Sequence, residues 1–504
     1  MRKFLLCAAL AGCLMASPLA AKNMEHFSLG VADDVKTLDP MMASDTMSFS
    51  VALHMFEPLV NVDGHTKQLV PVLAEKWEML DDHTYKFYLR HGVKFHNGEE
   101  MKASDVIFSV KRFAQESIFK GSTGKFIDPD GCEIVDDYTV LIRTKGPVGG
   151  FLENMKLPAF TICSEKAVNE LGKEYFRNPV GTGPFKFVSW SKGDKLELEA
   201  FDDYWGEKPA FKKLSIAVLP DDSSRVIALE TGKVDMIYMV PASDMDRINA
   251  DGKAKVVEAP GLNLTYMGMN TQSPKLSDPR VRQAIEYAID KNVYNAVVYQ
   301  GHAAVPAGPL VPASTFTPKT AVDWSFNLEK AKKLMAEVGD AAPKKLTLWV
   351  SNMQERIDGA TVIQSMLAQI GIQLDIQVFE SSVFYDNLKS GKQELFISRW
   401  GMQTNRDSGK YWNGLFNSDA IGNTNDTRTN NPEIDKLINE SIHTIDADAR
   451  NAMFEELWVK LNDYQSIVPL AVANELYGGR VDLVGMENFC DGRLNYLGRL
   501  TLAD

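Results

Sequence analysis

The stretch "KLSIAVLPDDSSRVIALETGKVDMIYM", residues 213–239, decides the fold class. Its first part, "KLSIAVL", is an apolar run typical of a buried strand. "DSSRVIALETG" has the apolar spacing of a helix and stops at Gly232, and "VDMIYM" gives a second strand. Because strand, helix and strand in this order form the unit of a parallel sheet, the sequence predicts an α/β fold.

A second region repeats this pattern further along the chain. "KLTLWVS", "IQLDIQVF" and "ELFISRW" are strand-like segments, and the helix between the first two stops at Gly371. Upstream, "SDPRVRQAIEYAIDK" predicts a helix with Asp278 as its cap and Pro279 at its first position. Since 504 residues exceed the size at which a single core keeps growing, we expect at least two lobes. No low-complexity linker separates them, which favours close crossing strands and a hinge.

The stretch "YKFYLRHGVKFHNGEEMKASDVIFSVKRF", residues 85–113, predicts a strand, a turn and a helix. Ser104 is the expected N-cap of that helix, with Asp105 in its first turn. His91 and His96 flank the turn and allow two interpretations, a metal site or scaffold. A metal site built from imidazoles needs further donors, and no third ligand has a suitable spacing, so the sequence favours scaffold.

The first 21 residues have the pattern of a secretory signal that is removed. Arg2 and Lys3 precede an apolar run too short to span a bilayer, and small residues lead to a cleavage site near Ala21. "LAGC" at 10–13 also has the form of a lipoprotein cleavage site, with Cys13 as the residue to be lipidated. The apolar run continues beyond Cys13, which favours the longer signal and a periplasmic protein.

The charge balance excludes some classes of partner. Without its first 21 residues the chain carries 52 bases and 67 acids, a net charge of −15. An acidic chain without basic blocks is a poor candidate for binding nucleic acid or anionic lipid. The remaining cysteines, Cys132, Cys163 and Cys490, allow one disulfide at most, and their spacing does not resemble a zinc site.

Known catalytic signatures are absent from the sequence. It contains no HExxH, no GxSxG, no complete phosphate loop and no GxGxxG opening a helix. We therefore expect a protein that is not an enzyme and that needs no cofactor.

The segment "RWGMQTNRDSGKYW", residues 399–412, is the strongest candidate for ligand binding. It follows a strand, and ligands of open α/β sheets bind beyond the carboxyl ends of strands. Arginine here could hold a carboxylate, aspartate an amine, and the aromatic residues an apolar group. The alternative is a surface loop with an incidental charge pair. The full set of expected ligand-binding residues is Arg399, Trp400, Gln403, Asn405, Arg406, Asp407, Tyr411, Asn270 and Met47.

A group of methionines near the N-terminus is compatible with a heme or soft-metal site. Met41, Met42, Met47 and Met55 lie close in sequence to His54. Methionine also fills cores and adaptable pockets, and these residues have no defined ligand spacing. The sequence therefore favours methionines that fill a core or pocket over methionines that bind a metal.

A set of segments resembles the extracytoplasmic solute-binding proteins of peptide and nickel ABC transporters, in the family's order over nearly all the mature chain. These segments are "TLDP" with "FEPLV", "LAEKWE", "YKFYLRHGVKFHNGEEMKASDVIFSVKR", "NPVGTGPFKF", "LETGKVDMI" and "DPRVRQAIEYAIDK". The resemblance implies two hinged lobes that close over a solute, the first enlarged by an extra subdomain. It places lobe I at 22–58, 181–262 and 478–504, the extra subdomain at 59–180, and lobe II at 263–477.

The same resemblance implies how a solute is held. In dipeptide-binding members, an aspartate after a tryptophan-ended strand holds the peptide amine, and an arginine near the preceding helix start holds its carboxylate. Trp400 matches that strand end, but Gln403 stands where the acid is expected. "ESSVF" at 380–384 offers serine near the arginine position. A peptide-like solute is therefore implied without fixing a dipeptide.

The resulting hypothesis is a monomeric periplasmic protein that captures a peptide-like small solute and delivers it to the membrane permease of an ABC transporter. A carrier of a nickel chelate or heme is the first alternative. A secreted peptide hydrolase is the second, and it would need an organised nucleophile or metal.

Overall fold

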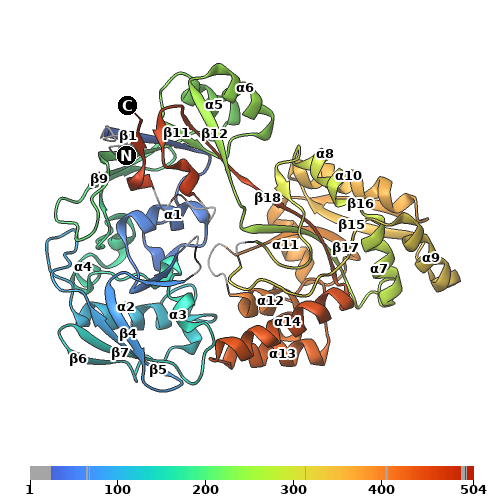
Figure 1. Cartoon of the computed structure of the whole chain (residues 1–504), viewed down its shortest axis with the longest axis horizontal. Helices are drawn as coiled ribbons and strands as arrows, with labels where there is room; N and C mark the ends of the chain where they lie inside the picture. Colours follow the sequence, from blue (N-terminus) through green and yellow to red (C-terminus); the bar gives the residue numbers. More distant parts are fainter. Residues whose placement is uncertain are drawn as a thin grey trace, which may run out of the picture.

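The computed structural model consists of two lobes that lie side by side (Figure 1). It describes residues 24–504 except 64, 65, 67, 313, 403–406, 490–493, 495, 496 and 504. Lobe I contains a seven-stranded and a four-stranded sheet, and lobe II contains a six-stranded sheet. The helices are α1 (Thr46–Met55), α2 (Ala103–Gln115), α3 (Phe151–Asn154), α4 (Glu165–Leu171), α5 (Asp222–Glu230), α6 (Met245–Asp251), α7 (Pro279–Ala288), α8 (Lys291–Val298), α9 (Leu328–Val338), α10 (Gln354–Ala368), α11 (Ser381–Lys389), α12 (Ser408–Phe416), α13 (Pro432–His443) and α14 (Ala447–Tyr464).

The seven-stranded sheet of lobe I confirms the predicted strand, helix and strand unit. Its order is β12 (Ala254–Ala259), β19 (Glu475–Arg480), β11 (Met236–Tyr238), β1 (Met24–Val31), β10 (Phe211–Val218), β9 (Lys195–Ala200) and β8 (Phe185–Ser191). The strands β10 and β11 both pair with β1 in parallel, and α5 connects them. The carboxyl ends of β1 and β11 therefore open on the same edge of the sheet.

The six-stranded sheet of lobe II is mixed. Its order is β14 (Ala303–Ala304), β18 (Ile467–Ala473), β13 (Asn263–Met269), β17 (Leu395–Gly401), β15 (Lys345–Ser351) and β16 (Gln373–Phe379). The strands β16 and β17 pair with β15 in parallel, as their sequence pattern predicts. Asp278 caps α7 and Pro279 opens it, which confirms that prediction too.

Two strand connections join the lobes. The first runs from β12 to β13 through residues 260–262, and the second from β18 to β19 through Asn474. Each connection leaves the sheet of one lobe and enters the sheet of the other within a few residues (Figure 1). Close crossing strands of this kind replace the flexible linker that the sequence lacks.

The four-stranded sheet has the order β4 (Ala74–Met79), β5 (Thr84–Leu89), β7 (Thr139–Arg143) and β6 (Glu133–Asp136). Tyr85, Phe87 and Leu89 on β5 are buried, as their alternation predicts. The expected cap of the next helix is wrong: α2 begins at Ala103, and Ser104 lies inside it. The carboxylate of Asp105 reaches back to accept a hydrogen bond from the Lys102 backbone N–H at 3.0 Å, which stabilises the start one residue earlier.

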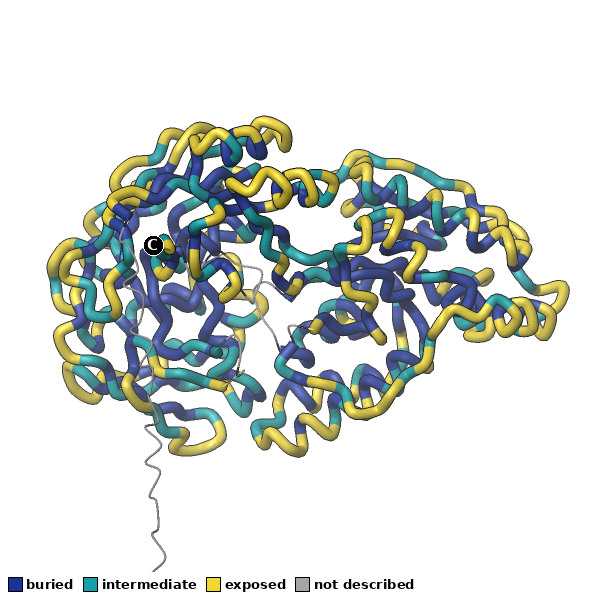
Figure 2. The backbone as a smooth tube through the Cα atoms, turned by 45° about the horizontal axis from the view of Figure 1, so that its top comes forward, coloured by how far each residue is buried: buried dark blue, intermediate teal, exposed yellow. Residues whose placement is uncertain are grey.

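Burial divides the chain into a few packed cores (Figure 2). One core runs without a break from the seven-stranded sheet into the four-stranded sheet of lobe I. The sheet of lobe II is covered on both faces, by α7 to α10 on one and by α11 to α14 on the other. Both faces are buried, and this explains why its strands are largely continuous apolar runs.

The lobes also touch away from the crossing strands. The backbone N–H of Gly149 donates to the carbonyl oxygen of Ile442 at 2.8 Å, and His443 Nδ1 lies 2.9 Å from the carbonyl oxygen of Pro147. A Cβ at Gly149 would lie 2.3 Å from the carbonyl oxygen of Thr444, so only glycine permits this approach. The loop before α3 thus rests directly on the end of α13.

Candidate functional site

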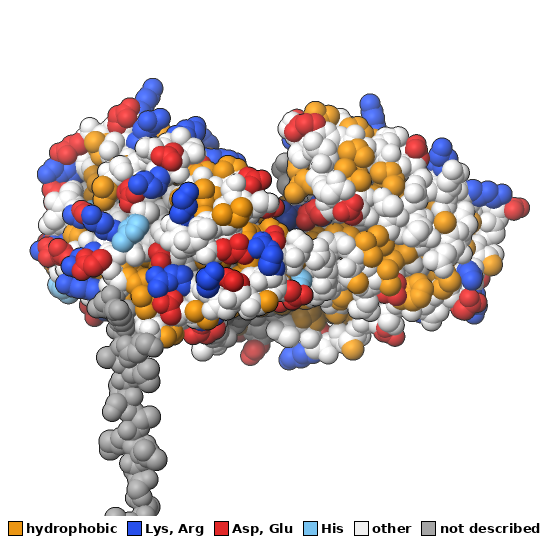
Figure 3. Space-filling model, turned by 90° about the horizontal axis from the view of Figure 1, so that it is seen from above, with side chains coloured by type: hydrophobic (Ala, Val, Ile, Leu, Met, Phe, Trp, Pro, Cys, Tyr) orange, Lys and Arg blue, Asp and Glu red, His pale blue; other side chains and the backbone are white. Residues whose placement is uncertain are grey.

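A cavity of about 660 Å³ lies between the lobes at the crossing strands, and we call it the interlobe cleft. Segments from both lobes and from both connections line it. A space-filling view from above shows a notch between the lobes with acidic and basic side chains beside it (Figure 3). The cleft lies beyond the carboxyl ends of β1 and β11, where open α/β sheets bind ligands.

The lobe I wall is formed by the loop after β1 and the start of α1. The carboxylate of Asp45 caps α1 by accepting from the Ser48 backbone N–H at 2.9 Å and from its hydroxyl at 2.8 Å. Ser48 Oγ also accepts from the Lys36 backbone N–H at 2.9 Å. Asp34 accepts from Trp190 Nε1 at 3.1 Å and from the Gly193 backbone N–H at 2.7 Å. These bonds give the wall a fixed shape.

The crossing strands supply a tyrosine and a glutamate to the cleft. The hydroxyl of Tyr238, at the end of β11, donates to Glu475 Oε2 at 2.8 Å. The Tyr238 ring stacks on Tyr477 with centroids 5.5 Å apart. Burial raises the pKa of Glu475, while the Tyr238 hydroxyl and the positive charge of Arg399 oppose that rise. The cation from lobe II therefore acts electrostatically on a carboxyl group at the crossing.

The lobe II wall carries that cation and a second acid. Arg399 on β17 is exposed, and among the described residues it forms no salt bridge within 4.0 Å. Glu355, at the start of α10, lies 3.3 Å from Arg356 Nη2. Thr265 and Tyr299 also line the cleft, and their hydroxyls are 3.0 Å apart. A guanidinium left open to a cleft is a ready partner for a carboxylate.

Met239 has a strained backbone at the edge of the cleft. Its φ is 62°, a left-handed conformation that only four non-glycine residues adopt within the described part of the chain. Arg225 Nη2 donates to its carbonyl oxygen at 2.9 Å, which holds the turn. The side chain remains 48% exposed and lines the cleft. Strain of this kind gathers at ligand sites, where the rest of the fold maintains it.

Of the residues expected from sequence, Arg399 and Met47 line the interlobe cleft. Trp400 points to the other face of β17, because side chains alternate along a strand. Its Nε1 donates to the carbonyl oxygen of Tyr411 at 3.1 Å, and Tyr411 is itself buried. Gln403, Asn405 and Arg406 lie outside the described residues.

Asp407 and Asn270 have structural contacts elsewhere. The buried carboxylate of Asp407 caps α12 by accepting from the Lys410 backbone N–H at 2.9 Å, and it forms an ion pair with Arg450 at 2.5 Å. Asn270 donates from Nδ2 to the carbonyl oxygens of Gly391 at 3.0 Å and Gln393 at 2.9 Å. Neither lines the cleft, and both fix loops of lobe II.

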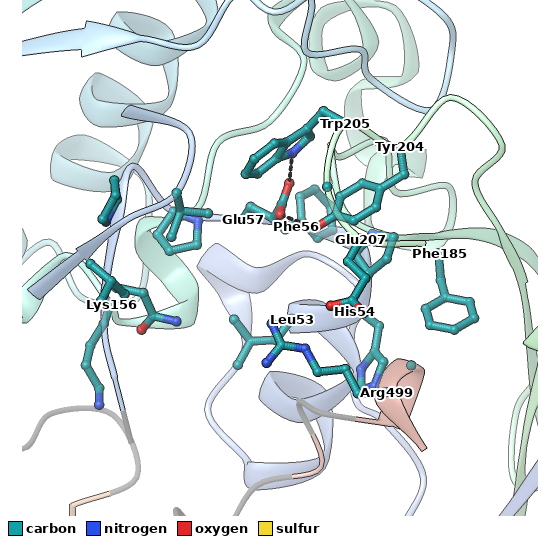
Figure 4. Close-up of a pocket in the computed structure, with 18 of the residues that line it drawn as sticks. Leu53, His54, Phe56, Glu57, Lys156, Phe185, Tyr204, Trp205, Glu207 and Arg499 are labelled. Atoms are coloured by element: carbon teal, nitrogen blue, oxygen red, sulfur yellow. Dashed lines mark hydrogen bonds between the residues drawn. The ribbon is translucent and has the colours of Figure 1, made fainter. Parts of the chain in front are cut away.

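A second cavity, of about 430 Å³, lies within lobe I, and we call it the inner pocket (Figure 4). The carboxylate of Glu57 accepts three hydrogen bonds there: from Thr182 at 2.9 Å, Tyr204 at 2.7 Å and Trp205 at 2.8 Å. Burial raises the pKa of Glu57 to about 7, and the hydrogen bonds limit the rise. Figure 4 shows this carboxylate directed at the two aromatic residues. The three donors to the Glu57 carboxylate all belong to lobe I.

The histidines and methionines singled out in the sequence do not form a common site. His96 is held by backbone groups of Gly181 and Gly183, and His91 packs on Tyr138, which are contacts that the scaffold interpretation expects. His54 lines the inner pocket, whereas Met47 lines the interlobe cleft. In the described residues, the only clustered histidine and acid side chains that could hold a metal are Asp81, Asp82 and His83, at the surface.

The sequence interpretation missed Tyr238, Glu475, Met239 and Glu355. The rule that pointed to the end of β17 also applies to "VDMIYM", whose carboxyl end carries Tyr238 and Met239. No sequence signal marks Glu475, because it enters the cleft through the second crossing.

Cys132 and Cys163 are buried free thiols, and Cys490 and the first 23 residues lie outside the described part. Among described residues, no helix is long and apolar enough to cross a membrane.

The chain matches a protein-family model and is similar in sequence to known proteins. Residues 68–422 match the model described as bacterial extracellular solute-binding proteins, family 5 middle. The chain is 29% identical over 512 residues to the dipeptide-binding protein of Escherichia coli K12, covering 94% of this chain and 95% of that one. It is 29% identical over 445 residues to heme-binding protein A of Haemophilus influenzae, covering 83% and 81%.

Solved structures agree with the sequence comparison. A periplasmic binding protein associated with an ABC transporter of Helicobacter pylori, in complex with the peptide STSA, superposes with a TM-score of 0.80. It is 25% identical and covers 96% of this chain and 99% of its own. The predicted two-lobed α/β fold is confirmed.

Proposed function

The chain belongs to the bacterial extracellular solute-binding proteins of family 5, and from that membership we propose that it captures a peptide-like small solute in the interlobe cleft and delivers it to the permease of an ABC transporter. The observation that carries the proposal is Arg399, an exposed cation of lobe II that lines the same cleft as Glu475 and Tyr238. A zwitterionic solute would meet a charge of either sign there. The protein binds and releases this solute without chemical change.

The proposed motion is a hinge at the two strand crossings. The sequence-based boundaries place lobe I at 22–58, 181–262 and 478–504, with the extra subdomain at 59–180, and lobe II at 263–477. We move the last boundary to Asn474, because β19 (Glu475–Arg480) belongs to the sheet of lobe I. The hinge lies at 260–262 and at Asn474, since β12 and β19 pair within the sheet of lobe I. Both connections are short, so a rotation there moves one lobe as a unit over the solute.

Each cleft residue has a proposed role. Arg399 binds the solute carboxylate, and Glu475 and Tyr238 bind a polar group close to the hinge. Met47 and Met239 supply adaptable apolar contact.

Gln403, Asn405 and Arg406 retain their proposed roles as solute contacts from the segment before α12. Asp407, Trp400, Tyr411 and Asn270 position the lobe II wall through the bonds described above.

The proposed location is the periplasm, with residues 1–21 as a removed signal and with the mature chain acting as a monomer. A heme carrier is the second candidate, favoured by the similarity to heme-binding protein A. The peptide proposal has the stronger support, because His54 lines the inner pocket while Met47 lines the interlobe cleft, so the two do not share one site for heme iron.

Native mass spectrometry of the protein purified without added ligand tests these candidates. The mass difference between native and denatured protein gives the retained solute, and fragmentation identifies it. A released peptide supports the proposal, whereas heme, detected also by its absorbance, would replace it with the second candidate. If the protein is empty, thermal shift with a peptide mixture follows, and a Tm that no peptide raises would contradict peptide binding.

A further inference from the structure

The charges that line the interlobe cleft are unbalanced. Among the described residues the lining contains five carboxylates and two cations, a formal charge of −3 at neutral pH. The acids are Asp33, Asp34, Asp45, Glu355 and Glu475, and the bases are Lys36 and Arg399. A cleft lined by one sign of charge between low-dielectric walls attracts solutes of the opposite sign.

Among the described residues, salt bridges neutralise little of this negative charge. Four of the five acids form no salt bridge with lysine or arginine in the described part of the chain, and only Glu355 has such a neighbour, Arg356. Asp34 and Asp45 accept hydrogen bonds from neutral donors, which fix the carboxylates and leave their charge in place. Asp33 is exposed. The acids therefore act on whatever enters the cleft.

Three of the five acids lie on the wall opposite the exposed arginine, whereas Glu355 shares the lobe II wall with it and Lys36 lies on the lobe I wall. Asp33, Asp34 and Asp45 belong to lobe I, Glu475 belongs to the crossing, and Arg399 belongs to lobe II. A peptide that placed its carboxylate on Arg399 would extend its amino groups toward lobe I. A second positive charge on the peptide would meet carboxylates that one amine leaves uncompensated.

We infer that the solute of the interlobe cleft is a short peptide of net positive charge, with its carboxylate on Arg399 and its cationic groups toward Asp33, Asp45 and Glu475. This inference rests on the proposed function and narrows it to one class of peptide. An acidic peptide, such as glutathione, would bring a second carboxylate into a cleft that already has an excess of them. Like charges that are brought together at a binding site repel each other and weaken the affinity for that solute.

The test is calorimetric titration with three tripeptides that differ only at their central residue: Ala-Lys-Ala, Ala-Leu-Ala and Ala-Glu-Ala. At low ionic strength we expect Ala-Lys-Ala to bind roughly tenfold more tightly than Ala-Leu-Ala, with Ala-Glu-Ala the weakest. Added salt should narrow these ratios, because it screens charges in a solvent-filled cleft. Glutathione extends the series and should bind no better than Ala-Glu-Ala.

The possible failures are distinguishable. If all three peptides bind equally, or if the acidic one binds best, the charge inference is overturned and the proposed function stands. If no peptide of the series or of a wider mixture binds while heme does, the proposed function falls and this inference falls with it. Selectivity for Ala-Lys-Ala that persists unchanged at high salt would also overturn an electrostatic origin.

Two variants locate the effect. Asp33→Asn removes an exposed acid of the cleft and Glu475→Gln removes the acid of the crossing, and each should reduce the Ala-Lys-Ala to Ala-Leu-Ala affinity ratio at least threefold. Asp375→Asn, an exposed position on the edge strand β16, changes the net charge equally and should leave the ratio unaltered. An equal reduction in all three variants would assign the preference to overall charge and overturn the site.

Discussion

The interlobe cleft and the inner pocket contain the same kinds of groups but use them differently. In the inner pocket, Glu57 accepts hydrogen bonds from Thr182, Tyr204 and Trp205, all within lobe I. In the cleft, Arg399 and Glu475 line the same cavity from either side of the hinge without a salt bridge between them in the described residues. One carboxylate is satisfied by its own fold, and the other shares a space with an unpaired cation.

This difference assigns a role in stability to the inner pocket and a role in solute binding to the interlobe cleft. A buried carboxylate with three internal donors holds the segments that supply those donors, and replacing it leaves them unsatisfied. A charged group at the boundary between two bodies contributes little until a solute connects them. Neither cavity size nor residue type makes this distinction, because both cavities have acids, a tyrosine and an arginine in their lining.

The largest expected effect is on the inner pocket. Glu57→Ala should lower the free energy of unfolding by about 4 kcal/mol, because it leaves three buried donors without an acceptor. Urea unfolding measures this loss, and calorimetry on the folded fraction should show solute affinity unchanged within twofold. A large loss of affinity with little loss of stability would reverse the roles assigned to the two cavities.

The next effect concerns pH and the same carboxyl group. Burial raises the pKa of Glu57 from 4.5 to about 7, so between these values the unfolded chain releases a proton that the folded protein retains. Stability is therefore lost as pH rises through this window, by up to about 3 kcal/mol. Glu57→Gln cannot ionise, and its amide can still accept from Trp205 and donate to the Tyr204 hydroxyl.

Unfolding of the wild type and of Glu57→Gln at pH 5 and pH 8 measures this linkage. From pH 5 to pH 8 the variant should gain about 3 kcal/mol relative to the wild type. Glu170→Gln provides the control, because it makes the same substitution at an exposed position. A difference between wild type and Glu57→Gln that is constant with pH would show that Glu57 is ionised when buried.

The sequence predicted the architecture well because most of it is local. Strand and helix periods, Gly232, Asp278 and Pro279 each act within a few residues, and the lack of a linker indicated crossing strands. The cap of α2 was misplaced because Ser104 is a good capping residue in isolation. The hydrogen bond that the Asp105 carboxylate accepts from the Lys102 backbone N–H instead favours the earlier start.

The candidate site was less predictable because it is assembled from distant segments. Arg399 was found by the strand-end rule, but its neighbour Trp400 was included although alternation sends it to the opposite face. Asp407 lies in a segment whose composition suits ligand binding. Only the fold reveals that this acid pairs with Arg450. Glu475 lies in the cleft solely because the second crossing brings it there.

A smaller effect tests the cation of the cleft. Arg399→Ala should weaken binding of a peptide carboxylate roughly 30-fold, equivalent to about 2 kcal/mol, while the free energy of unfolding changes by less than about 0.5 kcal/mol. Calorimetry and urea unfolding provide both numbers. Arg247→Ala removes an exposed arginine on α6 that pairs with Glu230 and Asp244 away from the cleft, and it should leave the affinity unchanged. Equal affinity in the two variants would exclude Arg399 from the solute contact.

The smallest effect tests whether the strain at Met239 belongs to the cleft. Met239→Gly relieves a left-handed backbone and should raise the free energy of unfolding by about 1 kcal/mol, yet weaken binding of an apolar peptide roughly fivefold by removing an exposed thioether. Gln300→Gly is the matched control, because Gln300 has a φ of 53° and does not line the cleft. Both variants should become more stable, and only Met239→Gly should lose affinity. If affinity is lost in neither, the strain at Met239 serves the hydrogen bond from Arg225 and the turn after β11 instead of the solute.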